Sequence, residues 1–530
     1  MVEGKRLVEV TGSAASATTD DERPTTAMRV GVGLDALNRI APWLIGAFAL
    51  AYCLLFTMMA VYWRDHLRWG FDIVVYAQPI WNTAHGRIWE LSIYNFTHTE
   101  LGHDFVPMEL ILAPFYRLFG GNMSLIVAQS ATVALGGIGV YAIARQAMPK
   151  IHRIIPVLFG VLYLSLLFIQ NANLEKIHLR NFVMWTWFFA WLGYRTNRTW
   201  LVWTMLLLAL TARSDVSLVV FMFGVLCLIE RRRWTLSWLP MIVGALWFVG
   251  VVYILVPHFS TRGFVYEDNY RWLGGGLSGM IRSALTRPLY VLRGVFTAAK
   301  LRYTFDLLFP FAFLPLLKPR ILLIPLPIYA LNILSNYAHQ YTIQAHYQAL
   351  IVPWLAIAAV EAVADIVERR GWAGGRLAAR WDRAGWRRRM TANASRTALA
   401  LVGLMLVFSI AQQETITSPI QSYLLHHGPN ARAVAGRQLI AMVPNDAPLA
   451  ITQKLAGNTP DRRSIYAFPG DPEYESPALV NRADYIIGDE RLSTDEAASI
   501  ARYRADPAWE VMDERGGFIL MRKRQPGSGA

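Results

Sequence analysis

The stretch APWLIGAFALAYCLLFTMMAVYW, residues 41–63, decides the fold class of this protein. It carries no charged side chain, and about 20 consecutive apolar residues are enough for an α-helix to cross a bilayer. A helix also satisfies its backbone hydrogen bonds internally, as the bilayer core requires. Because the stretch starts far from the N-terminus and is long enough to span, it predicts a membrane anchor rather than a cleaved signal peptide.

The composition of the rest of the chain agrees with a membrane protein. Of 530 residues, 54% are hydrophobic and only 17% are charged, and the mean hydropathy is +0.31, which excludes an ordinary soluble enzyme. The net charge of +14 comes from short basic bursts at the ends of apolar runs, so we expect membrane topology and no nucleic-acid partner. Cys53 and Cys227 lie inside apolar runs and predict no disulfide framework and no thiolate metal cluster.

Similar apolar runs recur along the chain. They predict an all-α polytopic membrane protein with about 11 transmembrane helices. The predicted spans are residues 41–63, 123–145, 154–170, 181–194, 200–212, 216–229, 236–256, 303–317, 321–335, 349–367 and 397–412.

Basic residues gather in alternate loops between these spans and set the expected orientation. The strongest such loop, residues 369–396, holds nine arginines against one aspartate, Asp382. Smaller basic loops lie at residues 145–153, 195–198, 231–233 and 318–320. If the spans alternate, all of these loops fall on one side, which the positive-inside rule assigns to the cytoplasm. The N-terminus is then cytoplasmic, and the region after the last span is extracytoplasmic.

The chain divides into three predicted regions. Residues 1–40 are polar and are interpreted as a disordered cytoplasmic tail, and residues 41–412 form the transmembrane domain, whose large first outer loop is residues 64–122. Residues 413–530 predict a small extracytoplasmic α/β domain. Its expected elements are helices at 431–442 and 494–503, strands at 449–452, 464–468 and 485–488, and a hairpin at 509–521 that turns at Gly516 and Gly517.

Asp72 opens the segment FDIVVYAQPIWNTAHG, residues 71–86, in the first outer loop. Apolar residues in this segment recur at helical spacing, so we expect an amphipathic helix at the membrane surface. A carboxylate at the start of such a helix either faces a cavity at the lipid boundary or caps the helix N-terminus. Position alone leaves both readings open.

Two further clusters combine imidazole and carboxylate groups. His103 and Asp104 precede an apolar stretch too short to span, where they either line a polar cavity or contribute to a divalent metal site. Glu175 and His178 lie in a short turn between two predicted spans, and on a helix their spacing would place them on one face. Such a pair suits acid/base chemistry or metal ligation, so a divalent metal is an open possibility.

The last two clusters lie at the ends of other predicted spans. Arg213 and Asp215 separate two strongly apolar segments, where charged side chains usually face water or each other. They form either a simple ion pair or a phosphate-binding arginine oriented by an aspartate. Before the span at 349–367, His339, His346 and Tyr347 form either an interfacial aromatic belt or a phosphate site.

The order of these motifs resembles one bacterial family. The segments FDIVVYAQPIWNTAHG, GHDFVPMELILAPFYRLFG (residues 102–120), LLFPFAFLPLLKPRILLIPLPIYALNILS (residues 307–335) and HYQALIVPW (residues 346–354) are similar to those of the membrane-protein family called domain of unknown function 2079. The resemblance runs from about residue 64 to the C-terminus and implies a multi-pass protein of the bacterial cytoplasmic membrane.

This family is in turn similar to the GT-C glycosyltransferases, whose donors are polyprenyl-phosphate-linked sugars. The resemblance implies an inverting transfer of a hexosyl or pentosyl group to a lipid or glycan acceptor at the outer face, with Asp72 as general base. The implied donor-phosphate or cavity-lining residues are Arg213, Asp215, His178, Glu175 and His346. Secondary candidates are His103, Asp104, His339 and Tyr347.

Two other functions compete with glycosyl transfer. A transporter or lipid flippase would use Arg213 and Asp215 along a substrate path, although such proteins often contain repeated halves and none is visible in this sequence. A non-catalytic envelope-assembly protein would use the C-terminal domain as a binding module. In that case the carboxylates of the first outer loop would be dispensable.

Overall fold

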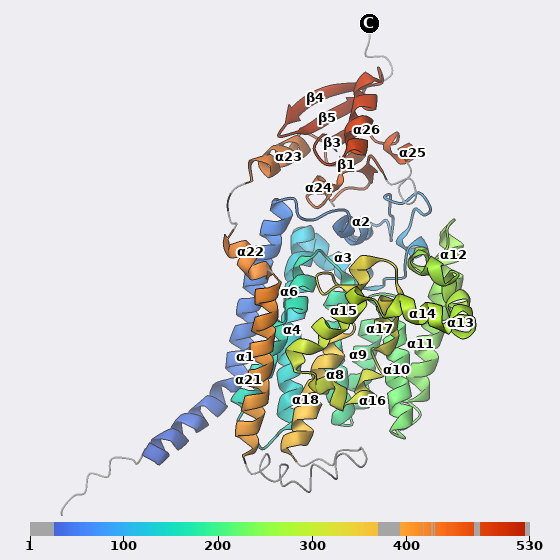
Figure 1. Cartoon of the computed structure of the whole chain (residues 1–530). Coiled ribbons are helices and arrows are strands. Elements are labelled where there is room, and N and C mark those ends of the chain that lie inside the picture. Colours follow the sequence, from blue (N-terminus) through green and yellow to red (C-terminus); the bar gives the residue numbers. More distant parts are fainter. Residues whose placement is uncertain are drawn as a thin grey trace, which may run out of the picture.

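The structure, a computed structural model, describes residues 26–368, 393–416, 418–425, 428, 430–459, 461–470 and 477–524, with side chains from residue 37 onward. A tall bundle of helices carries a small sheet domain at one end (Figure 1). The chain is therefore mostly helical with a C-terminal sheet, as the sequence predicts. Parts of the predicted N-terminal tail (residues 1–25) and of the basic loop (residues 369–392) lie outside the described residues.

The helical bundle contains elements of very different length. Its helices are α1 (Thr26–Asp65), α2 (Asp72–Ala84), α3 (Met108–Leu118), α4 (Asn122–Ala147), α5 (Ile154–Ser165), α6 (Leu167–Leu174), α7 (Leu179–Phe182), α8 (Met184–Arg195), α9 (Thr199–Leu210), α10 (Val216–Ile229), α11 (Trp238–Val249), α12 (Val256–Phe259), α13 (Gly276–Thr286), α14 (Pro288–Val295), α15 (Ala298–Leu308), α16 (Pro319–Leu322), α17 (Leu326–Leu334), α18 (Val352–Val367), α21 (Ala394–Thr415) and α22 (Pro419–Leu425). Helix α1 begins before the predicted boundary at residue 41 and so includes part of the predicted tail.

Four helices in the described part of the chain are long and apolar enough to cross a membrane. They run over Leu37–Asp65, Asn122–Ala147, Trp238–Phe259 and Ala394–Thr415, and each coincides with a predicted span. The bent pair of α5 and α6, whose axes meet at 50°, makes a fifth if it counts as one span. The total of about 11 spans stays a prediction, because helices such as α9 and α10 are shorter than a straight bilayer crossing.

The proline-rich segment of residues 303–335 does not form the two continuous helices that its hydropathy predicts. It breaks into the end of α15, two short 3₁₀ turns, α16 and α17. Proline lacks a backbone N–H and clashes with the preceding helical turn. The prolines in the segment are at positions 310, 315, 319, 325 and 327.

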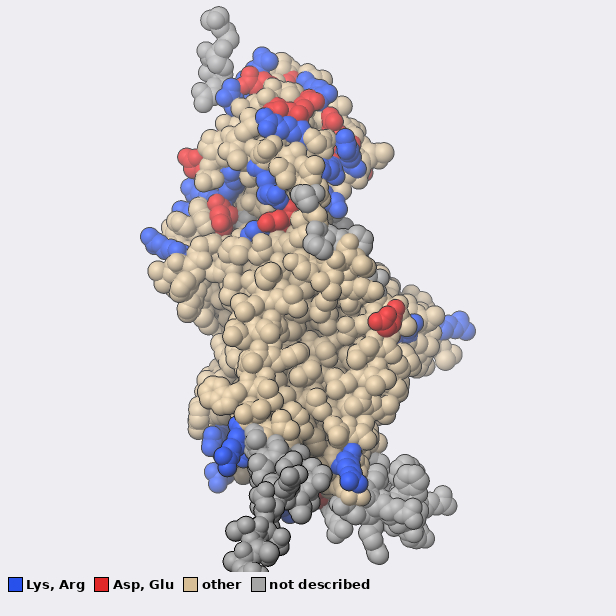
Figure 2. Space-filling view, turned by 90° about the vertical axis from the view of Figure 1, so that its left-hand side faces the viewer, with Lys and Arg blue, Asp and Glu red and all other residues tan. Residues whose placement is uncertain are grey.

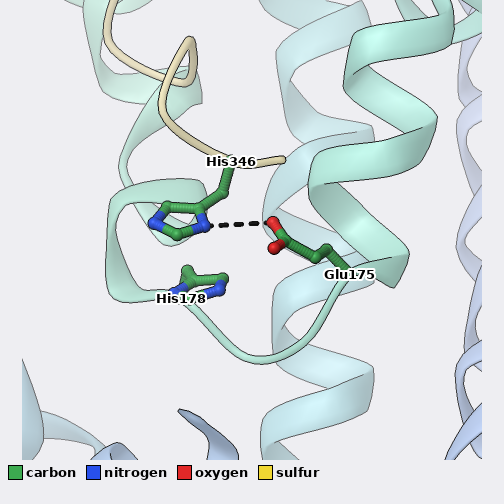
Figure 3. A group of neighbouring side chains, drawn as sticks. All are labelled: Glu175, His178 and His346. Carbon is green, nitrogen blue, oxygen red and sulfur yellow. Dashed lines mark hydrogen bonds and ion pairs between the residues drawn. The ribbon is translucent and has the colours of Figure 1, made fainter. Parts of the chain in front are cut away.

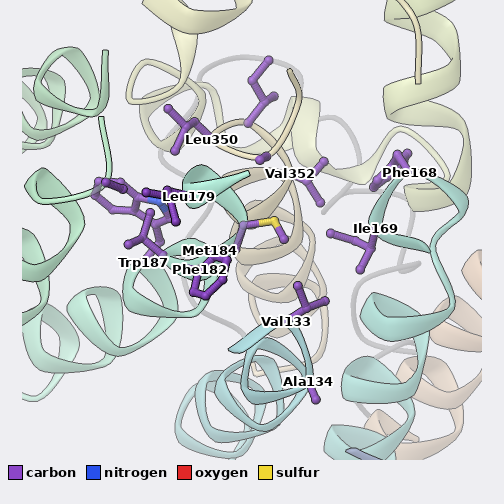
Figure 4. Close-up of a cluster of buried hydrophobic side chains, with 14 of the residues drawn as sticks. Val133, Ala134, Phe168, Ile169, Leu179, Phe182, Met184, Trp187, Leu350 and Val352 are labelled. Carbon is purple, nitrogen blue, oxygen red and sulfur yellow. The ribbon is translucent and has the colours of Figure 1, made fainter. Parts of the chain in front are cut away.

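A continuous apolar core fills the bundle. Figure 4 shows part of it, where side chains from α4, α6, α7, α8 and α18 meet. Trp187 and Trp354 are fully buried there, with ring centroids 5.6 Å apart. In lipid, close packing of this kind stabilises helix association, because the hydrophobic effect does not act between helices. Helix α7 begins directly after His178, and α18 begins at Val352, shortly after His346, so helices packed in this core position both imidazoles.

The C-terminal domain is a five-stranded sheet in the order β2-β1-β3-β5-β4. Its elements are β1 (Leu449–Thr452), β2 (Ile465–Phe468), β3 (Tyr485–Asp489), β4 (Trp509–Arg515) and β5 (Phe518–Lys523), with helices α23 (Ala431–Ala441), α24 (Gln453–Ala456), α25 (Pro477–Val480) and α26 (Thr494–Ala505). Strand β1 pairs in parallel with β2 and β3, whereas β5 pairs antiparallel with β3 and β4. Each predicted strand and helix of this region is present, and the hairpin turns at Gly516 and Gly517, both with positive φ.

This domain docks on helix α2, which lies between the sheet and the rest of the bundle (Figure 1). The Ser92 hydroxyl donates to the Ile465 carbonyl at 2.8 Å, and the Gln78 amide donates to the Arg463 carbonyl at 2.8 Å. The Tyr116 hydroxyl of α3 donates to the Asp461 carboxylate. Every residue of α2 from Ile73 to Ile80 is buried, so the predicted amphipathic helix is covered on all sides.

Charged residues gather at the two ends of the long axis of the molecule. Figure 2 shows lysines, arginines and acidic residues mixed over the sheet domain, a broad band poor in charge, and lysines and arginines at the far end. Three predicted basic loops meet the bundle at that far end. The Arg153 amide donates to Asn38 at 2.8 Å, Arg195 pairs with Glu361 at 3.3 Å, and Lys318 pairs with Asp365. The far end therefore matches the predicted basic side, while its assignment to the cytoplasm stays a prediction.

The close approach of α4 and α5 yields a test of bundle packing. A Cβ atom added at Gly160 would lie 2.7 Å from the Gly137 carbonyl oxygen and 2.6 Å from Ile45 Cδ1. We expect Gly160→Ala to lower the free energy of unfolding by about 1–3 kcal/mol, because the backbone of α4 must shift. The midpoint of thermal unfolding in detergent measures the effect. Gly46→Ala, which meets nothing within 4 Å, is the matched control; equal midpoints for the two variants would contradict this packing.

Candidate active site

A cavity of about 1070 Å³ lies between the helical bundle and the C-terminal domain. From the bundle it is lined by Asp72, Tyr76, His103, His178, Arg213, Tyr266, His346 and Tyr347. From the C-terminal domain it is lined by Gln453, Ser493, Asp495, Glu496, Ser499 and Arg502. The cavity thus brings together residues from all five predicted polar clusters with a domain that the sequence places hundreds of residues away.

Asp72 is the first residue of α2 and lines this cavity. It does not cap the helix: the N-cap position belongs to Phe71, and no side-chain capping bond is present there. Instead, Lys176 donates to the Asp72 carboxylate, whose side chain remains 50% exposed. The cavity-facing interpretation of Asp72 therefore agrees with the geometry, and the helix-cap alternative is wrong.

Gln129 of α4 holds the loop that carries Lys176. Its amide nitrogen donates to the carbonyls of Asn173 and Lys176, each at 2.8 Å, and its oxygen accepts from the His178 backbone N–H at 2.9 Å. Gln129 is buried, so these bonds form away from bulk solvent, where an unmade hydrogen bond is costly. One side chain thereby orders the whole segment from residue 173 to residue 178.

Glu175, His178 and His346 converge at this ordered loop (Figure 3). Glu175 Oε2 and His346 Nδ1 are 3.0 Å apart, and the rings of His178 and His346 stack with centroids 3.4 Å apart. Glu175 and His178 do not share a helix face as predicted, because α6 ends at Leu174 and α7 begins only at Leu179, so the residues between them are not helical. The pKa of each imidazole lies well below its ordinary value, chiefly because burial disfavours the charged form. Both rings are therefore neutral near pH 7.

Arg213 and Asp215 do not pair with each other as the simple ion-pair reading predicts. Arg213 Nε lies 3.1 Å from Asp104 Oδ2, and Arg180 donates to Asp215. The guanidinium of Arg213 also lies over the Tyr266 ring, 4.1 Å from its centroid. Arg213 and Asp215 therefore each form an ion pair with a residue of another segment, because each buried charge pairs with the opposite charge that packing brings nearest.

A second, smaller cavity of about 110 Å³ adjoins these ion pairs. It shares Arg213, Tyr266 and Tyr347 with the large cavity and is otherwise lined mainly by apolar residues. Four buried polar atoms of its lining have no hydrogen-bond partner among the described residues: the donors Arg180 Nε and Ser214 Oγ, and the acceptors Asp215 Oδ1 and Gln340 Oε1. Buried donors of this kind favour a ligand that supplies acceptor oxygens.

His103 is held in a different way from the other histidines. Its Nδ1 bonds Glu100 Oε1 at 2.9 Å and its Nε2 bonds the Tyr266 hydroxyl at 2.7 Å. Both ring nitrogens are therefore occupied, and Asp104 is engaged by Arg213. His103 lines the large cavity, as one prediction had it, whereas Asp104 lies behind the lining as the partner of Arg213. This geometry does not support the metal-site alternative for His103 and Asp104.

The two remaining candidates, Tyr347 and His339, lie in different surroundings. Tyr347 lines both cavities, and the Arg180 guanidinium lies 5.6 Å from its ring centroid. His339 is exposed in a 3₁₀ turn, with its ring 5.1 Å from that of Tyr337, and lines neither cavity. The interfacial alternative fits His339, whereas Tyr347 belongs to the site.

Sequence reasoning missed several residues of the site. Tyr266 lies in a 3₁₀ helix, Val265–Leu273, without a recognisable motif, and Glu496 and Arg502 reach the cavity from helix α26 of the other domain. Gln129 is one of a few polar residues on an otherwise apolar helix, and local patterns do not distinguish it from an ordinary buried amide. A buried glutamine in a predicted span is nevertheless a usable signal, because polar side chains there need specific partners.

Comparison with known proteins identifies the family. The family model described as "Predicted membrane protein (DUF2079)" matches residues 65–520. The chain belongs to this family. The family that the motifs indicated is therefore confirmed, and no curated protein sequence matches the DUF2079 chain.

Solved structures similar to this DUF2079 protein include ArnT from Cupriavidus metallidurans bound to undecaprenyl phosphate. It is 13% identical with a TM-score of 0.47, and the match covers 90% of this chain and 97% of ArnT. The oligosaccharyltransferase from Archaeoglobus fulgidus, in complex with Zn and sulfate, is also similar at 13% identity and a TM-score of 0.39. That match covers 85% of this chain and 69% of the other. Likenesses of this size carry no information about substrate.

The buried ion pair Arg213–Asp104 yields a prediction about stability. We expect Asp104→Asn to lower the free energy of unfolding by about 3–5 kcal/mol, because Arg213 would remain charged and buried without its partner. The double variant Asp104→Asn/Arg213→Met should recover part of the loss. Thermal unfolding in detergent measures both, with Glu510→Gln, which removes a solvent-exposed ion pair, as the control. A loss no larger than that of Glu510→Gln would contradict the assigned pairing.

Glu496 of the DUF2079 protein yields a prediction about pH. Burial raises the pKa of this carboxyl from its ordinary value of 4.5 to about 7. Because the folded pKa is the higher one, the stability that Glu496 contributes is full below pH 4.5 and is lost as pH rises through 7. We expect the wild type to lose more thermal stability between about pH 5 and about pH 8 than Glu496→Gln does. Parallel pH profiles for the two proteins would contradict this.

Proposed function

We propose that this protein is an inverting glycosyltransferase that moves a sugar from a polyprenyl-phosphate donor to an acceptor at the outer face of the bacterial cytoplasmic membrane. The observation that carries the proposal is a pair of adjacent cavities that share Arg213, Tyr266 and Tyr347 in their linings. One presents the accessible carboxylate of Asp72, and the other presents buried cationic donors at Arg180 and Arg213. A base and an anion site in adjacent cavities are what transfer from a phosphate leaving group requires.

Asp72 acts as the general base in this proposal. Its carboxylate takes the proton of an acceptor hydroxyl while that oxygen attacks the anomeric carbon of the donor sugar. The bond between the anomeric carbon and the phosphate oxygen breaks, and its electron pair leaves with the polyprenyl phosphate. A single displacement inverts the anomeric configuration. Lys176, which is bonded to Asp72, holds the carboxylate at the start of α2.

The leaving phosphate occupies the smaller cavity. Arg213 and the unpartnered Arg180 Nε and Ser214 Oγ supply donors to its oxygens, and the arginine charges offset the charge that develops on it. The same cavity continues along Val252, Leu277 and Met280, side chains that suit an isoprenoid chain. The Asp104 and Asp215 carboxylates fix the two guanidinium groups before the donor binds.

The acceptor enters from the side of the C-terminal domain. Polar residues of the C-terminal domain line the large cavity: Gln453, Ser493 at the N-cap of α26, and Ser499 and Arg502 within α26. Hydroxyl, amide and guanidinium groups of this kind hydrogen-bond the hydroxyl groups of a glycan or lipid head group. The C-terminal domain therefore selects the acceptor, while the bundle binds the donor.

Substitution of Asp72 tests the proposal. Asp72→Asn and Asp72→Ala are expected to reduce transfer by at least about 100-fold, because a general base contributes 10²–10⁴-fold. The assay uses the purified full chain in nanodiscs with a panel of polyprenyl-phosphate hexoses and pentoses, and mass spectrometry detects the product. Asp513→Asn, an aspartate of β4 that does not line either cavity, is the matched control.

Each other outcome identifies a different function. Transfer retained in both Asp72 variants removes this residue as the base. Donor movement across proteoliposomes by the wild type without any transfer product indicates a flippase or transporter. Neither transfer nor transport, together with full function of the Asp72 variants in cells, indicates a non-catalytic assembly protein.

A further inference from the structure

The histidine cluster on the wall of the large cavity contains more than a hydrogen-bonded pair. Glu175, His178 and His346 each offer one ligand atom, and these atoms lie within 4.8 Å of one another (Figure 3). Two of the residues come from the loop that Gln129 orders, and the third precedes α18. Two segments that are 171 residues apart in the chain thus present their ligating groups to one point.

The buried position of the His178 ring is not explained by hydrogen bonds within the protein. Its side chain is buried, with 5% of the residue exposed, and neither ring nitrogen has a hydrogen-bond partner among the described residues. An imidazole without partners in a buried position is costly, since its polar atoms lose their bonds to water. The ring of His178 instead contacts two neighbouring rings: His346 stacks on it, and Tyr76 lies edge-on with its centroid 5.9 Å away.

We infer that Glu175, His178 and His346 form a binding site for a divalent transition-metal ion, with Zn²⁺ as the best match. Two imidazole nitrogens and one carboxylate oxygen make up the three-ligand set of zinc sites that keep a fourth position open. Mg²⁺ and Ca²⁺ prefer oxygen ligands throughout and do not suit this set. The metal gives the unpartnered His178 nitrogen a bond and links the two loops.

The ligand atoms already lie close to the spacing that a zinc ion requires. Zinc bonds of about 2.0 Å in a tetrahedral arrangement place ligand atoms roughly 3.3 Å apart. Glu175 Oε2 and His346 Nδ1 already lie 3.0 Å apart, so the main change is a rotation of the stacked imidazoles about their side-chain bonds. The hydrogen bonds of Gln129 to this loop hold its backbone while the side chains turn.

The open fourth position faces the large cavity, because His178 and His346 both line it. Asp72 lines the same cavity, and its partner Lys176 lies between Glu175 and His178 in the chain. A bound ion would therefore add positive charge to the wall beside the carboxylate and present a water or an anionic oxygen to the cavity. The metal site follows from ligand geometry and holds whether or not the protein transfers sugar.

Metal content of the full-length protein tests this inference. The protein is purified in detergent, treated with a chelator, incubated with ZnCl₂ and freed of unbound ion, and zinc is then counted by mass spectrometry. We expect about one zinc per chain in the wild type and a rise in its thermal midpoint. His178→Gln and His346→Gln should weaken zinc binding by roughly 100-fold or more, since loss of even an outer-shell partner costs 10–100-fold.

His339→Gln is the matched control, because His339 is exposed and lies only a few residues before His346. It should bind zinc as the wild type does. Co²⁺ substitution in the wild type adds a readout that needs no variant: a four-coordinate site with nitrogen ligands should produce visible d–d absorption that Zn²⁺ displaces. Absence of bound zinc and of this absorption in the wild type, or ligand variants that bind zinc like His339→Gln, would overturn the inference.

Discussion

Buried charge is the constraint on which the site depends. Arg180 and Arg213 lie away from bulk solvent, where an unpaired charge is strongly unfavourable, so each must meet a carboxylate. The pairs that form, Arg213 with Asp104 and Arg180 with Asp215, tie the first large loop, helix α7 and the break between α9 and α10 to one another. These ties bring the lining of the two cavities into one place, and they leave Arg180 Nε and Ser214 Oγ available for a ligand.

The C-terminal domain completes what the bundle begins. Docking through Ser92, Gln78 and Tyr116 covers helix α2, and the sheet domain then lies opposite Asp72 across the large cavity. Without this domain Asp72 would lie on an open surface, where water weakens electrostatic interactions. The proposed catalytic carboxylate thus depends for its environment on residues almost four hundred positions later in the chain.

A single loop connects the proposed base with the inferred metal site. Gln129 orders the backbone from residue 173 to residue 178. From this loop Lys176 bonds to Asp72, and Glu175 and His178 contact His346. A buried amide with three satisfied hydrogen bonds is a rigid support, because releasing any of them leaves an unsatisfied polar group. The position of both chemical centres therefore rests on one uncharged side chain of α4.

The sequence by itself determined the elements whose signals are local. The apolar run at residues 41–63 became helix α1, the alternation and turn glycines near residue 516 became the β4–β5 hairpin, and Asp72 opened α2. Tertiary structure decided which side chains meet: Lys176 binds Asp72 across 104 positions, and Glu175 contacts His346 rather than sharing a helix face with His178. Helical and strand periodicities act within a few residues, whereas an ion pair forms with whichever partner packing brings close. Hydropathy likewise could not show that residues 303–335 break into short helices, because it does not register the N–H groups that proline lacks.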